Sequence, residues 1–213
     1  MTYEEEQEAL ATPEYWNGRY SQADGEKPTH EWFKTYDALK PFLTRHLFEP
    51  RRPEDNPSIL HLGSGDSTIP SDLASRGYKR QTCVDFSDVV VALMSKRDAT
   101  KDIDWLRLDV RDMVAIGSAT VDVAFDKGTM DAMIHGSPWD PPDDVLENTA
   151  RYMDEVRRVL KPDGVFLYIT FRQPHFVKPL LNRDGGWDLE MENLAEDASS
   201  FDYFGFRLTK KRV

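Results

Sequence analysis

Short apolar runs alternate with amphipathic stretches along the chain from residue 58 onward. The runs are typical of buried strands at residues 58–62, 81–86, 103–108, 121–125 and 165–170, and a late strand is expected at 201–210. Helical spacing between the strands predicts helices at residues 71–76, 89–97 and 145–160, the last ended by a turn at 161–164. Repeated strand–helix alternation favours right-handed crossovers. The pattern therefore predicts an α/β fold with a mostly parallel sheet and helices on both faces.

The region before this alternation has a different character. Trp32, Phe33, Tyr36, Leu39 and Leu43 recur at helical spacing, and a linker rich in proline and charge follows at residues 50–57. A chain of 213 residues has the usual length of one domain. We therefore expect a single domain over 1–213, in which an N-terminal helical region (1–50) precedes a sheet core (58–213). The acidic start at residues 4–8 is expected to be a solvated tail.

Composition narrows the possible partners. Lys and Arg number 27 and Asp and Glu 38, so the formal net charge is −11. Nucleic acid repels such a surface, so the expected partner is a basic protein or a neutral to cationic small molecule. The single cysteine, Cys83, excludes an intramolecular disulfide and a cysteine-based metal cluster. No apolar run approaches the ~20 residues that span a bilayer, and the acidic start is unlike a targeting peptide. These features predict a cytoplasmic protein without a membrane partner.

Candidate chemistry follows the predicted strands, because ligands of open α/β sheets gather at the carboxyl ends of the strands. Gly63 and Gly65 form a turn after the first strand, and Asp85 ends the second strand about 20 positions later. An acidic group at that offset accepts hydrogen bonds from ribose hydroxyls. Thr68 replaces the third glycine of the dinucleotide fingerprint, which disfavours a pyrophosphate ligand. S-adenosylmethionine, which has a ribose and an adenine but no phosphate, fits these features.

Two more carboxylates end the next strands. Asp109 follows the third strand, where an adenine amino group can donate to it, and Asp126 ends the fourth, near the expected site of the transferred group. Each residue taken alone has a structural alternative as a turn residue or a helix cap. The three strand-end acids, together with Gly63 and Gly65, favour the cofactor interpretation. The loop at residues 136–142 lies on the same edge and either shapes substrate access or only connects two elements.

Four segments carry a more specific resemblance. Residues 63–67 (GSGDS), 84–87 (VDFS), 108–111 (LDVR) and 126–131 (DKGTMD) resemble the motifs of class I, seven-stranded S-adenosylmethionine-dependent methyltransferases. More narrowly, they resemble the group that methylates lysines of elongation factor 1-alpha and is related to the N-terminal region of endothelin-converting enzyme 2. The segments at residues 15–20 (YWNGRY) and 32–33 (WF) also match this group. The resemblance implies a Rossmann-like, seven-stranded fold with an N-terminal helical lid.

Carried over position by position, the resemblance implies these cofactor contacts: Trp16, Tyr20, Trp32, Gly63, Asp85, Phe86, Asp109, Val110 and Lys127. The three N-terminal aromatic residues are expected to cover the methionyl end, or alternatively only to pack on the sheet. Asp126 is the candidate catalytic residue, expected to hold the substrate ammonium. No metal is expected.

The resemblance implies a methyltransferase that modifies a protein lysine, with elongation factor 1-alpha as the suspected substrate. Two alternatives remain open at this stage. One is a small-molecule N- or O-methyltransferase on the same fold, and the other is a cofactor-binding scaffold with little turnover.

Overall fold

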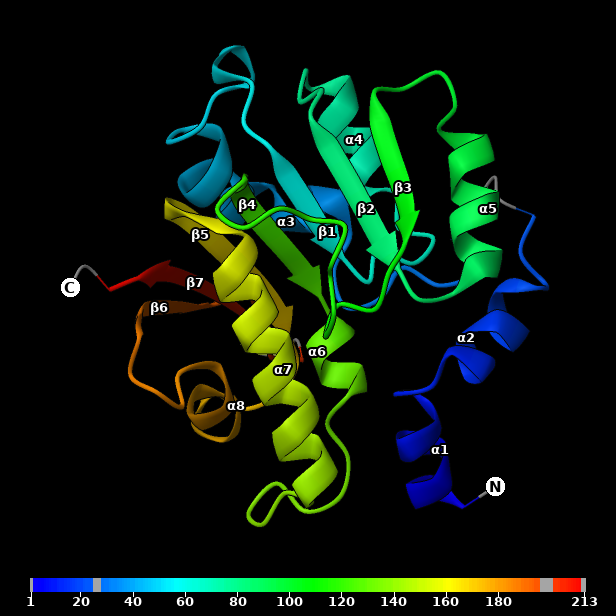
Figure 1. The fold of residues 1–213 in the computed structure, drawn as a ribbon, viewed down its shortest axis with the longest axis vertical. Coiled ribbons are helices and arrows are strands. Elements are labelled where there is room, and N and C mark those ends of the chain that lie inside the picture. Colours follow the sequence, from blue (N-terminus) through cyan, green and yellow to red (C-terminus); the bar gives the residue numbers. More distant parts are fainter. Residues whose placement is uncertain (1, 25–27, 196–200, 212–213) are drawn as a thin grey trace.

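The apolar runs form the centre of one seven-stranded sheet (Figure 1). In the computed structural model, which describes residues 2–24, 28–195 and 201–211, the strand order is β3-β2-β1-β4-β5-β7-β6. The parallel strands are β1 (Ile59–Leu62), β2 (Gln81–Asp85), β3 (Ile103–Arg107), β4 (Val121–Lys127) and β5 (Leu160–Thr170). The last two, β6 (Trp187–Asn193) and β7 (Phe204–Lys210), run antiparallel beside β5. The predicted mostly parallel sheet is thus confirmed.

Helices occupy both faces of the sheet and the N-terminal region (Figure 1). They are α1 (Tyr3–Ala9), α2 (Pro13–Tyr20), α3 (Tyr36–Leu43), α4 (Ile69–Ser75), α5 (Asp88–Arg97), α6 (Thr129–Ala132), α7 (Asp143–Val159) and α8 (Pro174–Leu181). A π-helical turn, η1 (Thr44–Phe48), continues α3, and a short 3₁₀ turn, η2 (Pro53–Asp55), precedes β1. No helix in the described part of the chain is long and apolar enough to span a membrane.

Two apolar layers fix the helices on the sheet. On one face, α3, η1 and α4 pack against β1, β4 and β5 through a cluster that includes Leu39, Phe42 and Leu73. On the other face, α7 and α8 pack through a cluster that includes Tyr152 and Leu181. Side chains of successive strand residues point to opposite faces, so neighbouring residues of one strand reach different layers. This alternation decides which strand-end side chains can enter a site on either face.

The N-terminal region differs from the sequence prediction in two places. The acidic start is not a solvated tail but the helix α1, because Thr2 and Glu5 form a capping box in which each side chain accepts the other residue's backbone N–H. Trp32 and Phe33 lie outside the predicted helix, which begins only at Tyr36 with Thr35 as its cap. Phe33 has φ 63°, a left-handed conformation that a helix does not contain.

The C-terminal third also departs from expectation. β5 begins at Leu160, so residues 161–164 lie within a strand rather than in the predicted turn. They form an irregularity in the β4–β5 pairing, because Val121 pairs with Leu160 whereas Val123 pairs with Val165. No pattern in the sequence predicted β6. Its residues alternate between apolar and acidic side chains, which is compatible with its place at the edge of the sheet. The late strand, β7, begins at Phe204 rather than at residue 201.

Candidate active site

A cavity of about 260 Å³ lies where the parallel strands end. Its wall is built from the segments that follow β1 to β5, closed on one side by the N-terminal region. Nine of the expected site residues contribute to this wall: Trp16, Tyr20, Trp32, Gly63, Asp85, Phe86, Asp109, Val110 and Lys127. Because neighbouring strands in the sheet are β3, β2, β1, β4 and β5, the wall runs from the end of β3 to the end of β5.

The two glycines after β1 shape the floor of this cavity. Gly63 and Gly65 have φ of +57° and +54°, which only glycine adopts without strain. A Cβ atom on Gly63 would overlap the side chain of Thr129, whose hydroxyl donates to the carbonyls of Leu62 (2.7 Å) and Gly63 (3.1 Å). A Cβ atom on Gly65 would lie 2.6 Å from the hydroxyl of Tyr20. The turn is therefore packed tightly between the start of α6 and the end of α2.

Asp85 holds the turn against the end of β2. Its Oδ2 accepts the Gly65 N–H at 3.0 Å, and its Oδ1 accepts the Ser87 N–H at 2.9 Å. The residue is only 5% exposed, and burial raises the pKa of its carboxyl to about 6. Each oxygen retains a further lone pair for a ligand hydroxyl. Phe86 and Val110 border the same region and offer apolar surface beside it.

Asp109 lies at the β3 end, partly exposed, and is held by a residue that the sequence analysis did not assign. The guanidinium of Arg111 binds both carboxylate oxygens, with Nη2 2.6 Å from Oδ2, and its Nη1 donates to Asn148 at 2.8 Å. The carboxylate is thus fixed at the cavity rim by a planar, bidentate partner. The contact of Asp109 with an adenine amino group stays a prediction.

Three aromatic residues from the N-terminal region cover the cavity. The Trp16 and Tyr20 rings stack with centroids 5.7 Å apart, and Trp32 meets Trp16 edge-to-face at 5.9 Å. Trp16 Nε1 donates to the carbonyl of Leu10, which joins α2 to the chain after α1. These residues pack on one another and also line the cavity, and Tyr20 belongs to an apolar cluster on the sheet. Their contact with the methionyl end of the cofactor stays a prediction.

Lys127 connects the end of β4 to the N-terminal region. Its side chain is 6% exposed, and Nζ lies 2.6 Å from the Glu31 carboxylate and 2.7 Å from the carbonyl of Trp32. Burial lowers the pKa of this lysine, and the neighbouring Glu31 opposes that effect. Glu31 also accepts the hydroxyl of Ser67 at 3.0 Å and the N–H of Thr68 at 3.3 Å. We call residues 29–34 the strap, because they cross between the glycine turn and β4.

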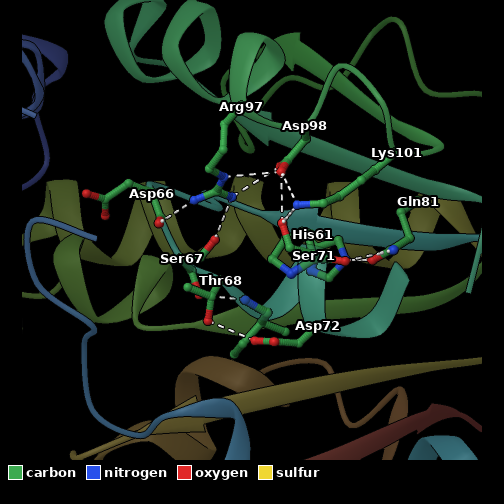
Figure 2. Close-up of polar contacts among 12 residues, drawn as sticks. His61, Asp66, Ser67, Thr68, Ser71, Asp72, Gln81, Arg97, Asp98 and Lys101 are labelled. Carbon is green, nitrogen blue, oxygen red and sulfur yellow. Dashed lines mark hydrogen bonds and ion pairs between the residues drawn. The ribbon is translucent and has the colours of Figure 1, made fainter. Parts of the chain in front are cut away.

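A buried polar cluster supports the glycine turn from the side of α5 (Figure 2). Arg97 donates to the carbonyls of Asp66 (3.1 Å) and Ser67 (3.0 Å), and its guanidinium also binds the Asp98 carboxylate. Asp98, whose side chain is fully buried, accepts as well from Ser71 (2.8 Å) and from the ammonium of Lys101 (3.0 Å). Sequence spacing gave no signal for this cluster, since its members come from three separate segments.

Asp126 does not reach the cavity, which corrects its expected contact with the substrate. The residue is 0% exposed and points toward α7, where its carboxylate accepts the Tyr152 hydroxyl at 2.7 Å. It also accepts the N–H groups of Thr129 (2.7 Å) and Met130 (3.0 Å) at the start of α6. Burial raises its pKa to about 7. Asp126 thus positions the turn between β4 and α6.

The carboxylate that does line the cavity on this side is Asp131, in α6. It accepts the hydroxyls of Tyr168 (2.5 Å) and Thr170 (2.6 Å), and Arg172 Nε lies 3.7 Å away. Burial raises the pKa of Asp131. The residue lies in the segment 126–131 singled out from the sequence, but nothing in the sequence indicated which of its two carboxylates would face the cavity.

The wall chemistry fits S-adenosylmethionine. A carboxylate at the end of β2 suits the ribose, and apolar surface from Phe86 and Val110 suits the adenine. Gly63 and Gly65 line the same cavity, and the absence of a Cβ lets their turn pack against Thr129 and Tyr20. The described residues contain no group of three or more His, Cys, Asp or Glu that would hold a metal ion.

Comparisons with known proteins agree with this geometry. A family model described as a methyltransferase domain matches residues 53–202. The chain is 36% identical over 166 residues to mouse "EEF1A lysine methyltransferase 4", covering 76% of this chain and 62% of that protein. It is 36% identical over 182 residues to the bovine protein of the same name, covering 83% and 68%. The chain thus spans less than two thirds of the mouse relative and slightly more than two thirds of the bovine one.

Among solved structures, the 1,6-didemethyltoxoflavin-N1-methyltransferase of Burkholderia thailandensis superposes with a TM-score of 0.63 at 16% identity. The match covers 100% of this chain and 92% of that chain, which was solved with bound S-adenosylhomocysteine. At this identity the similarity shows the fold alone. Fold, cavity and family model together show that the chain belongs to the methyltransferase domain family, on the class I seven-stranded fold, with S-adenosylmethionine as its cofactor.

Proposed function

We propose that the protein transfers a methyl group from S-adenosylmethionine to a lysine side chain of a protein, with elongation factor 1-alpha as the first candidate substrate. The observation that carries this proposal is the layout of the cavity. Its β2 and β3 end offers Asp85 and Asp109 for a nucleoside, and its β4 and β5 end offers the carboxylate of Asp131. Phe33 and Phe171, whose rings meet at 5.4 Å, line the same cavity and give it apolar wall.

A cavity lined by both a carboxylate and aromatic rings matches the chemistry of a lysine side chain, which has an apolar stem and a cationic end. The names of the mouse and bovine relatives support the same substrate class, since each relative is called a lysine methyltransferase of EEF1A. The net charge of −11 favours a basic partner. We also propose a cytoplasmic location, which the single, buried, unpaired Cys83 supports.

When bound, S-adenosylmethionine supplies a methyl group on a sulfonium, which a neutral amine can attack. The protein's residues must therefore orient the amine, exclude water and allow the ammonium to lose a proton. Asp131 orients the ammonium through the lone pairs that Tyr168 and Thr170 leave free. The apolar walls lower the pKa of a lysine, ordinarily about 10.4, because desolvation disfavours its charged form. The proton then leaves to solvent through the open mouth.

Radiolabelled methyl transfer tests this proposal. The protein is incubated with labelled S-adenosylmethionine and with elongation factor 1-alpha produced in bacteria, and the products are separated by size. Label in the elongation factor band supports the proposal. Label only in small molecules would instead indicate a small-molecule methyltransferase, and no label in any product, with cofactor binding retained, would indicate a scaffold.

A further inference from the structure

A second cavity, of about 300 Å³, adjoins the cofactor cavity. Phe171 and Arg172, which follow β5, line both cavities and so form the partition between them. The remaining wall is mainly apolar. The loop after α6 and α8 supply Ile134, Pro138, Pro141, Phe176, Val177 and Leu180, and Gln173 and Phe201 complete it. We call this cavity, together with Trp139 at its rim, the aromatic groove.

Trp139 is 80% exposed, although it is a large apolar side chain. Its ring nevertheless has defined contacts: it packs edge-to-face on Phe176, with centroids 4.8 Å apart, and its centroid lies 6.0 Å from that of His175. The loop that carries it is closed by Gly136, whose φ is +70° and where a Cβ would press on Pro142. An exposed tryptophan beside an apolar cavity is typical of a protein-binding surface, where it supplies much of the binding energy.

The charges around the groove indicate the chemistry of its occupant. Asp140 directly follows Trp139, and Asp143 and Asp144 begin α7; all three are exposed. The Asp144 carboxylate contacts His135 at 2.9 Å, which leaves Asp140 and Asp143 as the acidic groups available at the rim. Arg172, a cation in the groove wall, is already engaged, since it donates to the carbonyls of Asp131 (3.1 Å) and Ile134 (2.5 Å). An apolar floor with an acidic rim complements a segment that combines an apolar side chain with basic residues.

We propose that the aromatic groove docks a segment of the protein substrate that carries an apolar side chain and basic residues next to the acceptor lysine. This inference rests on the proposed function. Because Phe171 and Arg172 are shared by both cavities, a chain seated in the groove passes directly to the mouth beside Asp131. The groove thus selects the lysine by its sequence neighbours, while the cofactor cavity carries out the transfer.

The test compares three variants in methylation of bacterially produced elongation factor 1-alpha. Trp139→Ala removes the exposed ring, Asp140→Lys reverses a rim charge, and Val114→Ala is the matched control at a residue 79% exposed outside the groove. We expect Trp139→Ala to lower kcat/KM by about tenfold or more, through KM, which is typical of a tryptophan that becomes buried when a partner binds. Asp140→Lys is expected to lower kcat/KM most at low ionic strength. Val114→Ala should keep the wild-type kcat/KM. Every variant should bind S-adenosylhomocysteine with wild-type affinity.

Four other results would each contradict a different part of the proposal. If Trp139→Ala has the wild-type kcat/KM, the groove does not bind the substrate, and the proposed function is unaffected. A parallel loss of S-adenosylhomocysteine affinity would assign Trp139 to support of the cofactor site. Sedimentation that shows a wild-type dimer dissociated by Trp139→Ala would make a second copy of the chain the occupant. A wild-type enzyme that methylates no protein would overturn the proposed function and this occupant together.

Discussion

The Lys127 ammonium lies 2.6 Å from the Glu31 carboxylate, and both side chains are largely shielded from solvent. This ion pair joins two segments that are almost a hundred residues apart in the sequence, the strap and the end of β4. Because Glu31 also binds Ser67 and Thr68, one carboxylate fixes the strap, the glycine turn and β4 at the same edge of the cavity. Trp32, which follows Glu31 in the strap, is held at the cavity by this contact and by the hydrogen bond from Lys127 to its carbonyl.

Removing the carboxylate should leave a buried, unpaired lysine. We expect Glu31→Ala to lower the free energy of unfolding by about 3 kcal/mol, as is usual when one partner of a buried pair is lost. Affinity for S-adenosylhomocysteine should fall as the strap loosens. Chemical denaturation and calorimetric titration measure the two effects. The double variant Glu31→Gln, Lys127→Met should regain stability but not affinity, and exposed Glu49→Gln serves as the control. If Glu31→Ala binds S-adenosylhomocysteine with wild-type affinity, the strap does not contribute to cofactor binding.

Asp85 should make cofactor binding depend on pH. Burial raises the pKa of its carboxyl to about 6, so the carboxylate, which we expect to accept ribose hydroxyls, is protonated as the pH falls through about 6. Affinity for S-adenosylhomocysteine should therefore weaken below that pH. Asp85→Asn should weaken binding at pH 8 by about 1.5–3 kcal/mol, the range for a hydrogen bond to a charged group, and should remove this pH dependence. A variant that retains the wild-type pH profile would exclude Asp85 as its cause.

Arg97 is expected to act through the glycine turn rather than by touching the cofactor. Arg97→Leu removes the donors to the carbonyls of Asp66 and Ser67 and leaves Asp98 with fewer partners. We expect a lower melting temperature and a weaker affinity for S-adenosylhomocysteine, with kcat at saturating cofactor nearly unchanged. Arg107→Leu, at an exposed position on β3, is the control. A fall in kcat without a change in affinity would contradict this positioning role.

Asp126 should oppose folding at neutral and alkaline pH. Burial raises its pKa to about 7, so the native state binds this proton more tightly than the unfolded chain does. The group's contribution to stability therefore declines as the pH rises from about 4 to about 7. Asp126→Asn is neutral at every pH, so its melting temperature should rise relative to wild type between pH 5 and pH 8. Thermal denaturation across this range checks the sign, and a relative fall would refute a raised pKa.

The sequence predicted the parallel strands well because buried strands are rich in apolar residues, as at residues 165–169 of β5. It did not predict β6, because an edge strand with one solvated face carries charges that resemble a loop. It placed Trp32 and Phe33 in a helix because apolar spacing cannot reveal the left-handed backbone at Phe33. Long-range contacts decided these cases, and local composition does not encode such contacts.

The same limit applies to the site. Residues at strand ends, such as Asp85, were predictable because topology gathers them at one edge. Asp126 was wrongly expected there because its place in the strand alternation was not known. Ala124 packs toward α7 and Phe125 toward α3, so Asp126 follows Ala124 to the α7 face, whereas Lys127 reaches the strap. Glu31 and Arg97 gave no signal, since their roles depend on partners that are distant in the sequence.

Intact-mass analysis of elongation factor 1-alpha tests the central claim most directly. Elongation factor 1-alpha is produced in bacteria, so that no eukaryotic enzyme has methylated its lysines. It is then incubated with S-adenosylmethionine and either the wild-type protein or Asp85→Asn. The account predicts a mass increase by whole methyl groups with the wild-type protein, assigned by fragmentation to a lysine side chain, and a much slower increase with Asp85→Asn. An elongation factor of unchanged mass, or a methyl group on any residue other than lysine, would contradict it.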